Sequence, residues 1–186
     1  IEIWNDVFME YEKKDGKVVG KLAQKNVDTG AGLERITAVM QNKNTAYDTD
    51  LLDSAMGIIK QGSKEWDEKS GRVVIDHFRT AIFMIGDGVI PSNKDRGYIL
   101  RRLIRRAVLK MKIMMTDSLV GTSLVQEVLN KYSGTYPELL NVDVRSILRT
   151  EEEKFLKTLE NGMKEFEKGE IDPFVLFTTH GFPIEV

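Results

Sequence analysis

The chain contains no cysteine, which excludes disulfide bonds and thiolate metal sites and is compatible with a reducing compartment. It has only two histidines, His77 and His180, and two isolated histidines without cysteine argue against a zinc site. The formal charge of −2 gives no overall sign of nucleic-acid binding, so any RNA site has to be a local patch. No apolar run approaches the ~20 residues that cross a bilayer, so we expect no membrane partner.

The remaining composition is that of a folded, globular protein. Apolar residues make up 41% and charged residues 30% of the 186 positions, a balance that excludes a disordered chain. This length suits one large or two small domains with a buried core. The chain shows no signal-peptide pattern and does not begin with methionine, so we expect it to start inside a larger protein.

Two kinds of pattern divide the chain near residue 45 and together predict an α+β fold. Residues 1–30 are rich in β-forming side chains and contain an Asp15-Gly16 turn, which predicts strands joined by a hairpin. Two or three strands are marginal in isolation, so this sheet is expected to need partners from elsewhere. The remainder has helical periodicity. The expected helices cover residues 31–41, 48–60, 72–87, 96–114, 118–132, 142–168 and a short piece near 173–178.

A glycine-containing turn at residues 27–35 leads directly into a helix. Gly30 and Gly32 allow the backbone to approach a ligand closely, because neither carries a Cβ atom. The start of the helix adds unpaired N–H groups and partial positive charge. Asp28 offers a carboxylate to a cation, and Arg35 offers a planar fork to phosphate or carboxylate. The alternative is an ordinary turn and a capped helix with a surface arginine, and spacing alone favours that alternative.

The predicted helix over residues 96–114 concentrates positive charge. Its apolar residues fall on one continuous stripe, namely Leu100, Leu103, Ile104, Ala107 and Met111. Its cations lie on the flanks and the opposite side, namely Arg101, Arg102, Arg105, Arg106, Lys110 and Lys112. No carboxylate intervenes, so salt bridges within the helix cannot neutralise these charges, and we expect them to form a ladder facing solvent. A polyanion such as an RNA backbone is favoured over a merely solvated face.

Two further features carry open alternatives. Asn93 lies in a loop ahead of the basic helix, where its amide could read a base edge in the minor groove of an RNA helix. The alternative is that it caps the helix that begins near Asp95, and its position alone favours that role. The helix from Thr150 to Lys168 opens with three glutamates, as the helix dipole favours, and is expected to be a packing strut.

Seven segments resemble, in the same order, motifs of the alanyl-tRNA synthetases, a family of class II aminoacyl-tRNA synthetases. They are IEIWNDVFM (1–9), DTGAGLER (28–35), RVVIDHFR (72–79), DGVIPSN (87–93), RGYILRR (96–102), TEEEKF (150–155) and HGFP (180–183). The second is similar to the third signature motif of class II enzymes. Each motif alone is weak or moderate, whereas the collinear set is highly specific and covers nearly the whole chain.

The resemblance implies ATP-dependent activation of alanine and its transfer to tRNA(Ala), with ATP and Mg²⁺ as cofactors. Asp28 would then bind the alanine ammonium group, Gly30 would leave room for the ligand, and Asn5 would contact the amino acid. Arg35 would be the catalytic, ATP-binding residue, and Gly32 would also adjoin ATP. On this interpretation residues 1–45 form the carboxy-terminal part of the class II catalytic domain, with its antiparallel sheet, and residues 46–186 form a helical domain that recognises the tRNA acceptor stem.

The resemblance also implies a set of tRNA-binding residues: Asn93, Arg96, Arg101, Arg102, Arg105, Arg106 and Thr178. In the family the residue matching Asn93 reads the guanine–uracil wobble pair of the acceptor stem, together with an aspartate. Thr178 stands where that aspartate is expected. A threonine hydroxyl still forms a hydrogen bond but carries no charge, so wobble-pair selectivity is either weaker here or carried by another residue.

The first two class II motifs lie upstream in the family, and an editing domain is a separate segment; neither has a counterpart here. The 186 residues alone are therefore expected to form no adenylate. The competing hypothesis is a non-enzymatic helical RNA-binding module, and a third is a protein–protein adaptor whose basic helix meets an acidic partner. A cytoplasmic location is expected, with an organelle as the alternative.

Overall fold

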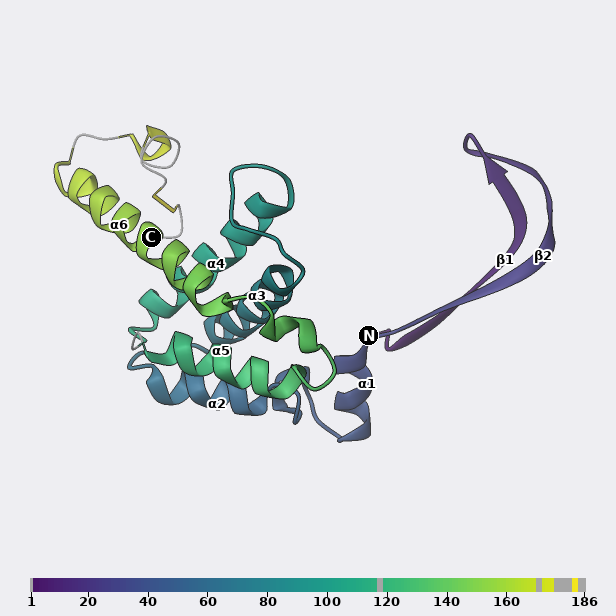
Figure 1. Ribbon diagram of the computed structural model, residues 1–186, viewed down its shortest axis with the longest axis horizontal. Coiled ribbons are helices and arrows are strands. Elements are labelled where there is room, and N and C mark those ends of the chain that lie inside the picture. Colours follow the sequence, from purple (N-terminus) through teal and green to yellow (C-terminus); the bar gives the residue numbers. More distant parts are fainter. Residues whose placement is uncertain (1, 117–118, 170–171, 176–181, 184–186) are drawn as a thin grey trace. The chain divides into compact units, whose positions relative to one another are not determined.

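The computed structural model describes residues 2–116, 119–169, 172–175 and 182–183. The chain divides into two compact units, Ile1–Ser54 and Ala55–Val186. The first unit holds a β-ribbon and a short helix, and the second is built from helices (Figure 1).

The ribbon consists of strands β1 (Trp4–Lys14) and β2 (Lys17–Ala31), which pair in antiparallel fashion with irregularities in the register between Met9 and Tyr11 and between Glu12 and Lys13. The turn between them is the predicted Asp-Gly hairpin, in which Asp15 and Gly16 have φ of 49° and 81°. Positive φ at both central residues matches the twist of the flanking strands, which explains why this dipeptide ends β1 and starts β2.

Large apolar side chains lie exposed on this ribbon, with Phe8 78% and Val27 63% accessible. In the part of the chain that the structure describes, the sheet has two strands only. A two-stranded ribbon buries too little surface to be stable by itself, and its need for partner strands stays a prediction. Strand β2 is followed by helix α1 (Leu33–Met40) and then by a short 3₁₀ helix, η1 (Ala46–Asp48).

The second unit has helices close to those predicted. They are α2 (Asp53–Gly62), α3 (Glu68–Gly86), α4 (Asp95–Ile113), α5 (Leu119–Tyr132) and α6 (Val144–Glu167), with a 3₁₀ turn η2 (Pro137–Leu140). Helix α3 begins earlier than expected because Asp67 caps it, accepting a hydrogen bond of 2.8 Å from the Ser70 backbone N–H. The predicted helix near 173–178 lies partly outside the described residues.

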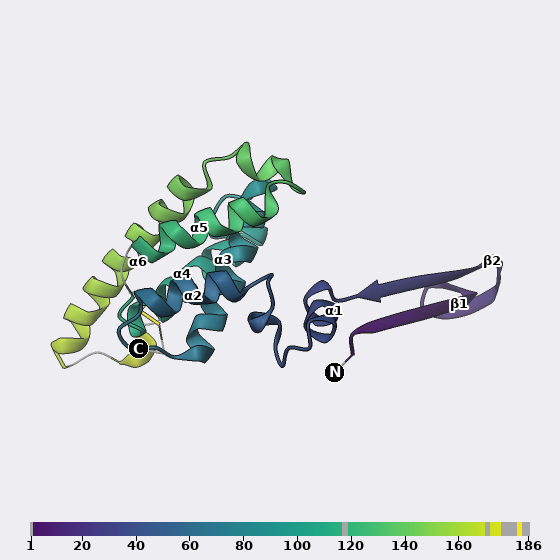
Figure 2. The ribbon, with the colours of Figure 1, turned by 90° about the horizontal axis from the view of Figure 1, so that it is seen from below.

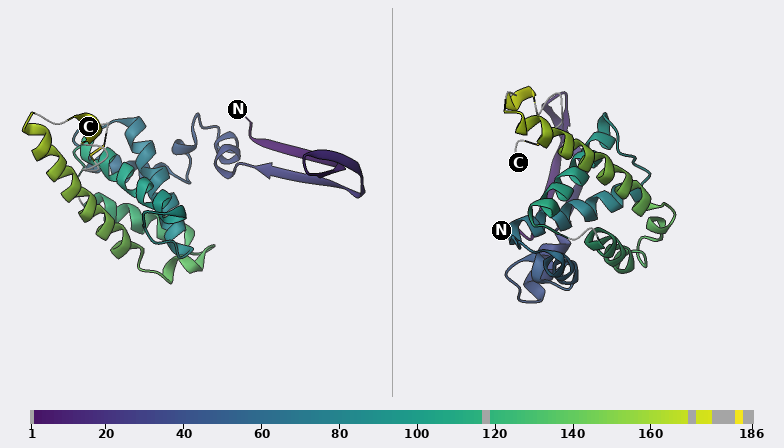
Figure 3. Two further views of the ribbon diagram at one scale, coloured as in Figure 1. Left: turned by 90° about the horizontal axis from the view of Figure 1, so that it is seen from above. Right: turned by 90° about the vertical axis from the view of Figure 1, so that its left-hand side faces the viewer.

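The core of this unit lies between α3 and α4, with α5 and α6 packed around them (Figure 2 and Figure 3). Helix α3 contributes its buried apolar face, of which Ile75, Phe78 and Ile82 are members. On α4 the predicted stripe is confirmed, except that Leu103 is half-buried and Val108 and Leu109 are buried as well. The observed architecture is the predicted α+β fold, an antiparallel sheet followed by a mainly helical part.

Candidate functional site

One face of the ribbon carries the three residues expected to contact an amino acid. In the strand register Asn5 lies opposite Gly30, and Val7 lies opposite Asp28. Directly opposed residues of an antiparallel pair share a face, and so do residues two apart on a strand. Asn5, Asp28 and Gly30 therefore lie on the same face. A Cβ added at Gly30 would lie 3.4 Å from Asn5 Oδ1, so the glycine leaves open the space beside that amide.

The other face of the ribbon is held by its own hydrogen bonds. The Trp4 indole Nε1 donates to Thr29 Oγ1 at 2.7 Å and to Asp6 Oδ1 at 3.3 Å. Trp4, Asp6 and Thr29 alternate with Asn5 and Asp28 along their strands, so they point to the opposite side. These bonds fix which side of the ribbon Asn5 and Asp28 occupy.

Arg35 is linked to Asn5 through Glu2. The Arg35 Nη1 atom donates to the Glu2 backbone oxygen at 2.7 Å, and Asn5 Nδ2 donates to Glu2 Oε1 at 2.7 Å. Gly32 lies directly against Arg35, since a Cβ there would be 3.2 Å from Arg35 Cδ. Arg35 is exposed to solvent, so its guanidinium group can bind an anion. The hydrogen bond to the Glu2 backbone oxygen holds the side chain in place.

The basic helix α4 differs from its prediction in one respect. The expectation that all its cations face solvent is wrong for Arg101, Arg105 and Lys110, which are half-buried, and the two arginines form ion pairs with Glu151 of α6. The Arg105 Nε atom donates to Glu151 Oε1 at 2.7 Å, and the Arg101 Nε atom lies 3.3 Å from the same oxygen. The sequence could not show this pairing, because the carboxylate comes from a helix 46 residues further along the chain.

Three of the predicted RNA-binding arginines are exposed: Arg96, Arg102 and Arg106. Arg102 lies over the ring of Tyr98, with its Cζ atom 5.8 Å from the ring centroid, an arrangement that restrains the guanidinium group without neutralising it. Because the apolar stripe anchors α4 in the core, these side chains stand on its outer surface. Of the predicted cationic ladder, Arg102, Arg106 and Lys112 are exposed and can meet a polyanion.

Asn93 lies exposed in the loop before α4. Its Oδ1 atom accepts a hydrogen bond from Arg101 Nη1. The cap position of α4 is Lys94, whose side chain makes no capping bond, so the alternative role of Asn93 as the helix cap is not observed. The other residue expected to read the wobble pair, Thr178, lies outside the described residues.

His77 of α3 is influenced by the same basic surface. Burial lowers its pKa below the ordinary value of 6.5, the positive charge of Arg106 lowers it further, and Asp76 opposes the shift. The imidazole therefore stays neutral at physiological pH. A neutral, half-buried histidine on α3 is a packing residue here.

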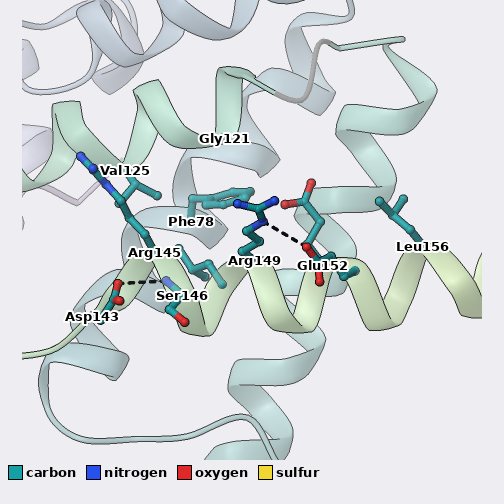
Figure 4. Close-up of a pocket in the computed structure, with 11 residues that line it drawn as sticks. Phe78, Gly121, Val125, Asp143, Arg145, Ser146, Arg149, Glu152 and Leu156 are labelled. Atoms are coloured by element: carbon teal, nitrogen blue, oxygen red, sulfur yellow. Dashed lines mark hydrogen bonds and ion pairs between the residues drawn. The ribbon is translucent and has the colours of Figure 1, made fainter.

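A pocket of 790 Å³ lies between α3, α5 and α6, and none of the residues that line it belongs to the predicted sites (Figure 4). Its walls include Phe78, Val125 and Leu156 together with the charged side chains of Arg149 and Glu152, which point toward one another (Figure 4). Burial raises the pKa of Glu152, the neighbouring Glu153 raises it further, and Arg149 lowers it. No pattern in the sequence pointed to this pocket, because its walls come from three separate helices.

Two kinds of feature are absent from the described residues. These residues contain no group of three or more histidine, aspartate or glutamate side chains that could hold a metal ion. No helix among them is long and apolar enough to cross a membrane.

Comparison with known proteins places these features in a family. The family model of class II (A) tRNA synthetases matches residues 1–186. The chain is similar to proteins named alanine–tRNA ligase, among them those of Hydrogenovibrio crunogenus at 42% identity, Elusimicrobium minutum at 40% and Thermotoga maritima at 42%. All of this chain aligns in each case, but it spans only 23% of the length of these relatives. The chain belongs to the class II (A) tRNA synthetases.

Proposed function

We propose that this chain is the part of an alanine–tRNA ligase that contacts alanine and ATP with its ribbon and the tRNA acceptor stem with its helices. The observation that carries the proposal is the shared face of Asn5, Asp28 and Gly30 beside Arg35, in a chain whose relatives are named alanine–tRNA ligases. Residues 1–45 would belong to the catalytic domain and residues 46–186 to the acceptor-stem domain. A role in protein synthesis makes the cytoplasm, or an organelle that translates, the place of action.

The amino-acid end of the site has the chemistry that alanine requires. The Asp28 carboxylate offers a charge-assisted hydrogen bond to the ammonium group. Gly30 has no side chain to occupy the space next to Asn5, and the Asn5 amide is oriented by its bond to Glu2. The side chain of alanine is a single methyl group, which offers little contact surface. Contacts to its charged groups and to its backbone atoms would therefore carry most of the affinity.

The ATP end depends on Arg35. Its exposed guanidinium group suits a polyphosphate, and attack by the alanine carboxylate on the α-phosphate needs mainly positioning and neutralisation of charge. Gly32 would keep the backbone close to the nucleotide. Mg²⁺ would accompany ATP, bound mainly by its phosphate oxygens.

The RNA end would use two kinds of contact. Arg96, Arg102 and Arg106 would bind phosphates and so supply affinity that falls with salt. Asn93 would contact a base edge in the minor groove and so supply selectivity. The alanyl group would then pass from the adenylate to the terminal adenosine of the bound tRNA.

The test compares two isosteric changes on opposite faces of the ribbon in the full-length protein. Asp28→Asn is expected to raise the KM for alanine in ATP–pyrophosphate exchange about tenfold or more, because a charge-assisted bond to the ammonium group is removed. Asp6→Asn, on the other face, is the matched control and should leave this KM unchanged. Residues 1–186 alone should show no exchange.

Three results would contradict this proposal. Full-length protein that shows no alanine-dependent exchange would favour the non-enzymatic RNA-binding module. Equal effects of Asp28→Asn and Asp6→Asn would remove the ribbon face from the amino-acid site. Robust exchange by residues 1–186 would refute the expectation that they lack activation chemistry.

A further inference from the structure

Glu151 is a buried carboxylate that the proposed chemistry does not use. It lies on α6 in the TEEEKF segment and is only 2% accessible, whereas Glu153 two positions further is exposed. A carboxylate is expensive to bury unless it is paired and hydrogen-bonded. The structure gives it two cationic partners from one helix, Arg101 and Arg105.

The two arginines are held in different ways. Arg105 donates its Nε–H to Glu151 Oε1 at 2.7 Å, and its Cζ atom lies 5.4 Å from the ring centroid of Phe155. Arg101 keeps its Nε atom 3.3 Å from the same oxygen; among the described residues this nitrogen has no hydrogen-bond partner, so the attraction is that of an ion pair. The other end of the Arg101 guanidinium, Nη1, donates to Asn93 Oδ1.

A continuous chain of contacts thus leads from a buried carboxylate to an exposed amide. A guanidinium group only donates hydrogen bonds, so the Asn93 side chain has to turn its oxygen toward Arg101 and its NH₂ group away from it. Without Glu151, Arg101 would be an ordinary flexible side chain that loses rotamer freedom when it holds Asn93. With Glu151, part of this ordering is already provided by the fold.

We propose that Glu151 is a positioning residue for RNA recognition: through Arg101 it sets the orientation in which Asn93 presents its amide to the acceptor stem. This inference rests on the proposed function, because it assumes that Asn93 reads a base edge. It assigns to Arg101 and Arg105 a task other than neutralising phosphate. It also assigns to the first turns of α6 a task beyond packing.

The experiment measures selectivity and not only affinity. Full-length wild-type protein, Glu151→Gln, Asn93→Ala and the double variant are titrated with two acceptor-stem RNA hairpins that differ in one pair, guanine–uracil or guanine–cytosine. Glu151→Gln keeps the size of the side chain but removes the charge that holds Arg101. We expect it to weaken binding of the wobble hairpin about tenfold, the effect that follows when a hydrogen bond to a charged group is disordered.

The remaining measurements distinguish a role of Glu151 in positioning Asn93 from a general loss of stability. The Watson–Crick hairpin should bind Glu151→Gln as it binds wild type, and the dependence of log Kd on log salt should not change, because the exposed arginines are intact. The double variant should show the selectivity of Asn93→Ala alone. Glu153→Gln is the matched control, since Glu153 is exposed and pairs with Arg149 and not with α4. It should leave both hairpins unaffected.

A second variant covers the case in which Glu151→Gln folds poorly. Arg101→Lys leaves the Glu151–Arg105 bond in place, but one ammonium group cannot span both Glu151 and Asn93 as the fork of arginine does. It should reduce selectivity in the same direction with little change in the melting temperature. Additive effects of Glu151→Gln and Asn93→Ala, or equal weakening of both hairpins, would overturn the inference.

An error in the proposed function would give a result that can be told apart from an error in this inference. If wild-type protein does not distinguish the hairpins, then the base-reading role of Asn93 fails first. The positioning claim is then decided by a crystal structure of the Glu151→Gln protein. Loss of the Arg101–Asn93 hydrogen bond would support it, and persistence of that bond would overturn it.

Discussion

Gly97, in the first turn of α4, lies so close to Ile90 that a Cβ atom there would be 2.5 Å from the Ile90 carbonyl oxygen. The Ser92 backbone N–H donates to the Gly97 carbonyl oxygen at 3.0 Å, and the Ser92 hydroxyl donates to the Lys94 oxygen at 2.9 Å. The loop that carries Asn93 is therefore held against α4 by backbone contacts that tolerate no side chain at this position. Gly97 of the RGYILRR motif is therefore needed because any larger side chain would collide with this loop.

Gly97→Ala should push this loop away from α4. We expect a loss of about 1–3 kcal/mol in the free energy of unfolding, the usual cost of an overpacked contact, and reduced selectivity between the two acceptor-stem hairpins. Gly57→Ala in α2 is the control, because nothing lies within 4 Å of the added Cβ atom and alanine is the better helix former. Thermal unfolding and hairpin titration measure both effects. Wild-type selectivity in the Gly97→Ala protein would contradict this placement of the loop.

The arginines of α4 should separate into two classes. Changing the exposed Arg102 or Arg106 to alanine should weaken binding of both hairpins alike, because each would neutralise phosphate charge. The salt slope of log Kd should become shallower by ~0.7–0.9 for each phosphate that the variant no longer neutralises. Neither change should lower the melting temperature appreciably, because neither residue pairs with Glu151.

Arg105→Ala should behave in the opposite way. It removes the 2.7 Å partner of a buried carboxylate, so we expect a loss of about 1–3 kcal/mol of stability and a smaller change in salt slope. Urea unfolding and titrations at several salt concentrations distinguish the two classes. If Arg102→Ala and Arg105→Ala had the same effects on stability and on the salt slope, then the distinction between exposed and half-buried arginines of α4 would be wrong.

His77 should make stability depend on pH. Its pKa in the folded protein is below the ordinary 6.5, so the unfolded chain takes up a proton at a higher pH than the folded chain does. Stability is therefore full above pH 6.5 and falls as the pH drops below it. His77→Gln cannot be protonated and should flatten the part of the pH–stability curve between about 6.5 and 5, where carboxylates contribute little. An unchanged curve would contradict the depressed pKa.

Glu152 should show the opposite dependence. Burial and Glu153 raise its pKa above the ordinary 4.5, so its ionisation at neutral pH disfavours the folded state. Glu152→Gln should raise the melting temperature at pH 7, and the gain should shrink as the pH approaches 4.5, where the wild-type carboxyl group becomes protonated. Glu160→Gln, at an exposed position of the same helix, serves as the control. A lower melting temperature for Glu152→Gln at pH 7 would show that its attraction to Arg149 outweighs the cost of burial.

The sequence by itself determined the elements and the family. The Asp15-Gly16 hairpin could be predicted because Asp-Gly readily adopts the positive φ at both central residues that a two-residue type I′ turn requires, and both residues have positive φ in the structure. The apolar stripe of α4 could be predicted because side chains three and four apart share a helix face. The motif order indicated a class II synthetase, and the family match confirms it.

Only the tertiary structure decided which charges are available to a ligand. Six cations without a carboxylate in the helix predicted a fully exposed ladder, yet Glu151 from α6 pairs with two of them. In the same way, the sequence allowed Asn93 to be a helix cap or a base reader, and its bond to Arg101 shows what orients it. Local periodicity specifies which side of a helix is apolar, whereas the partner of a charge depends on which distant helix the fold brings alongside it.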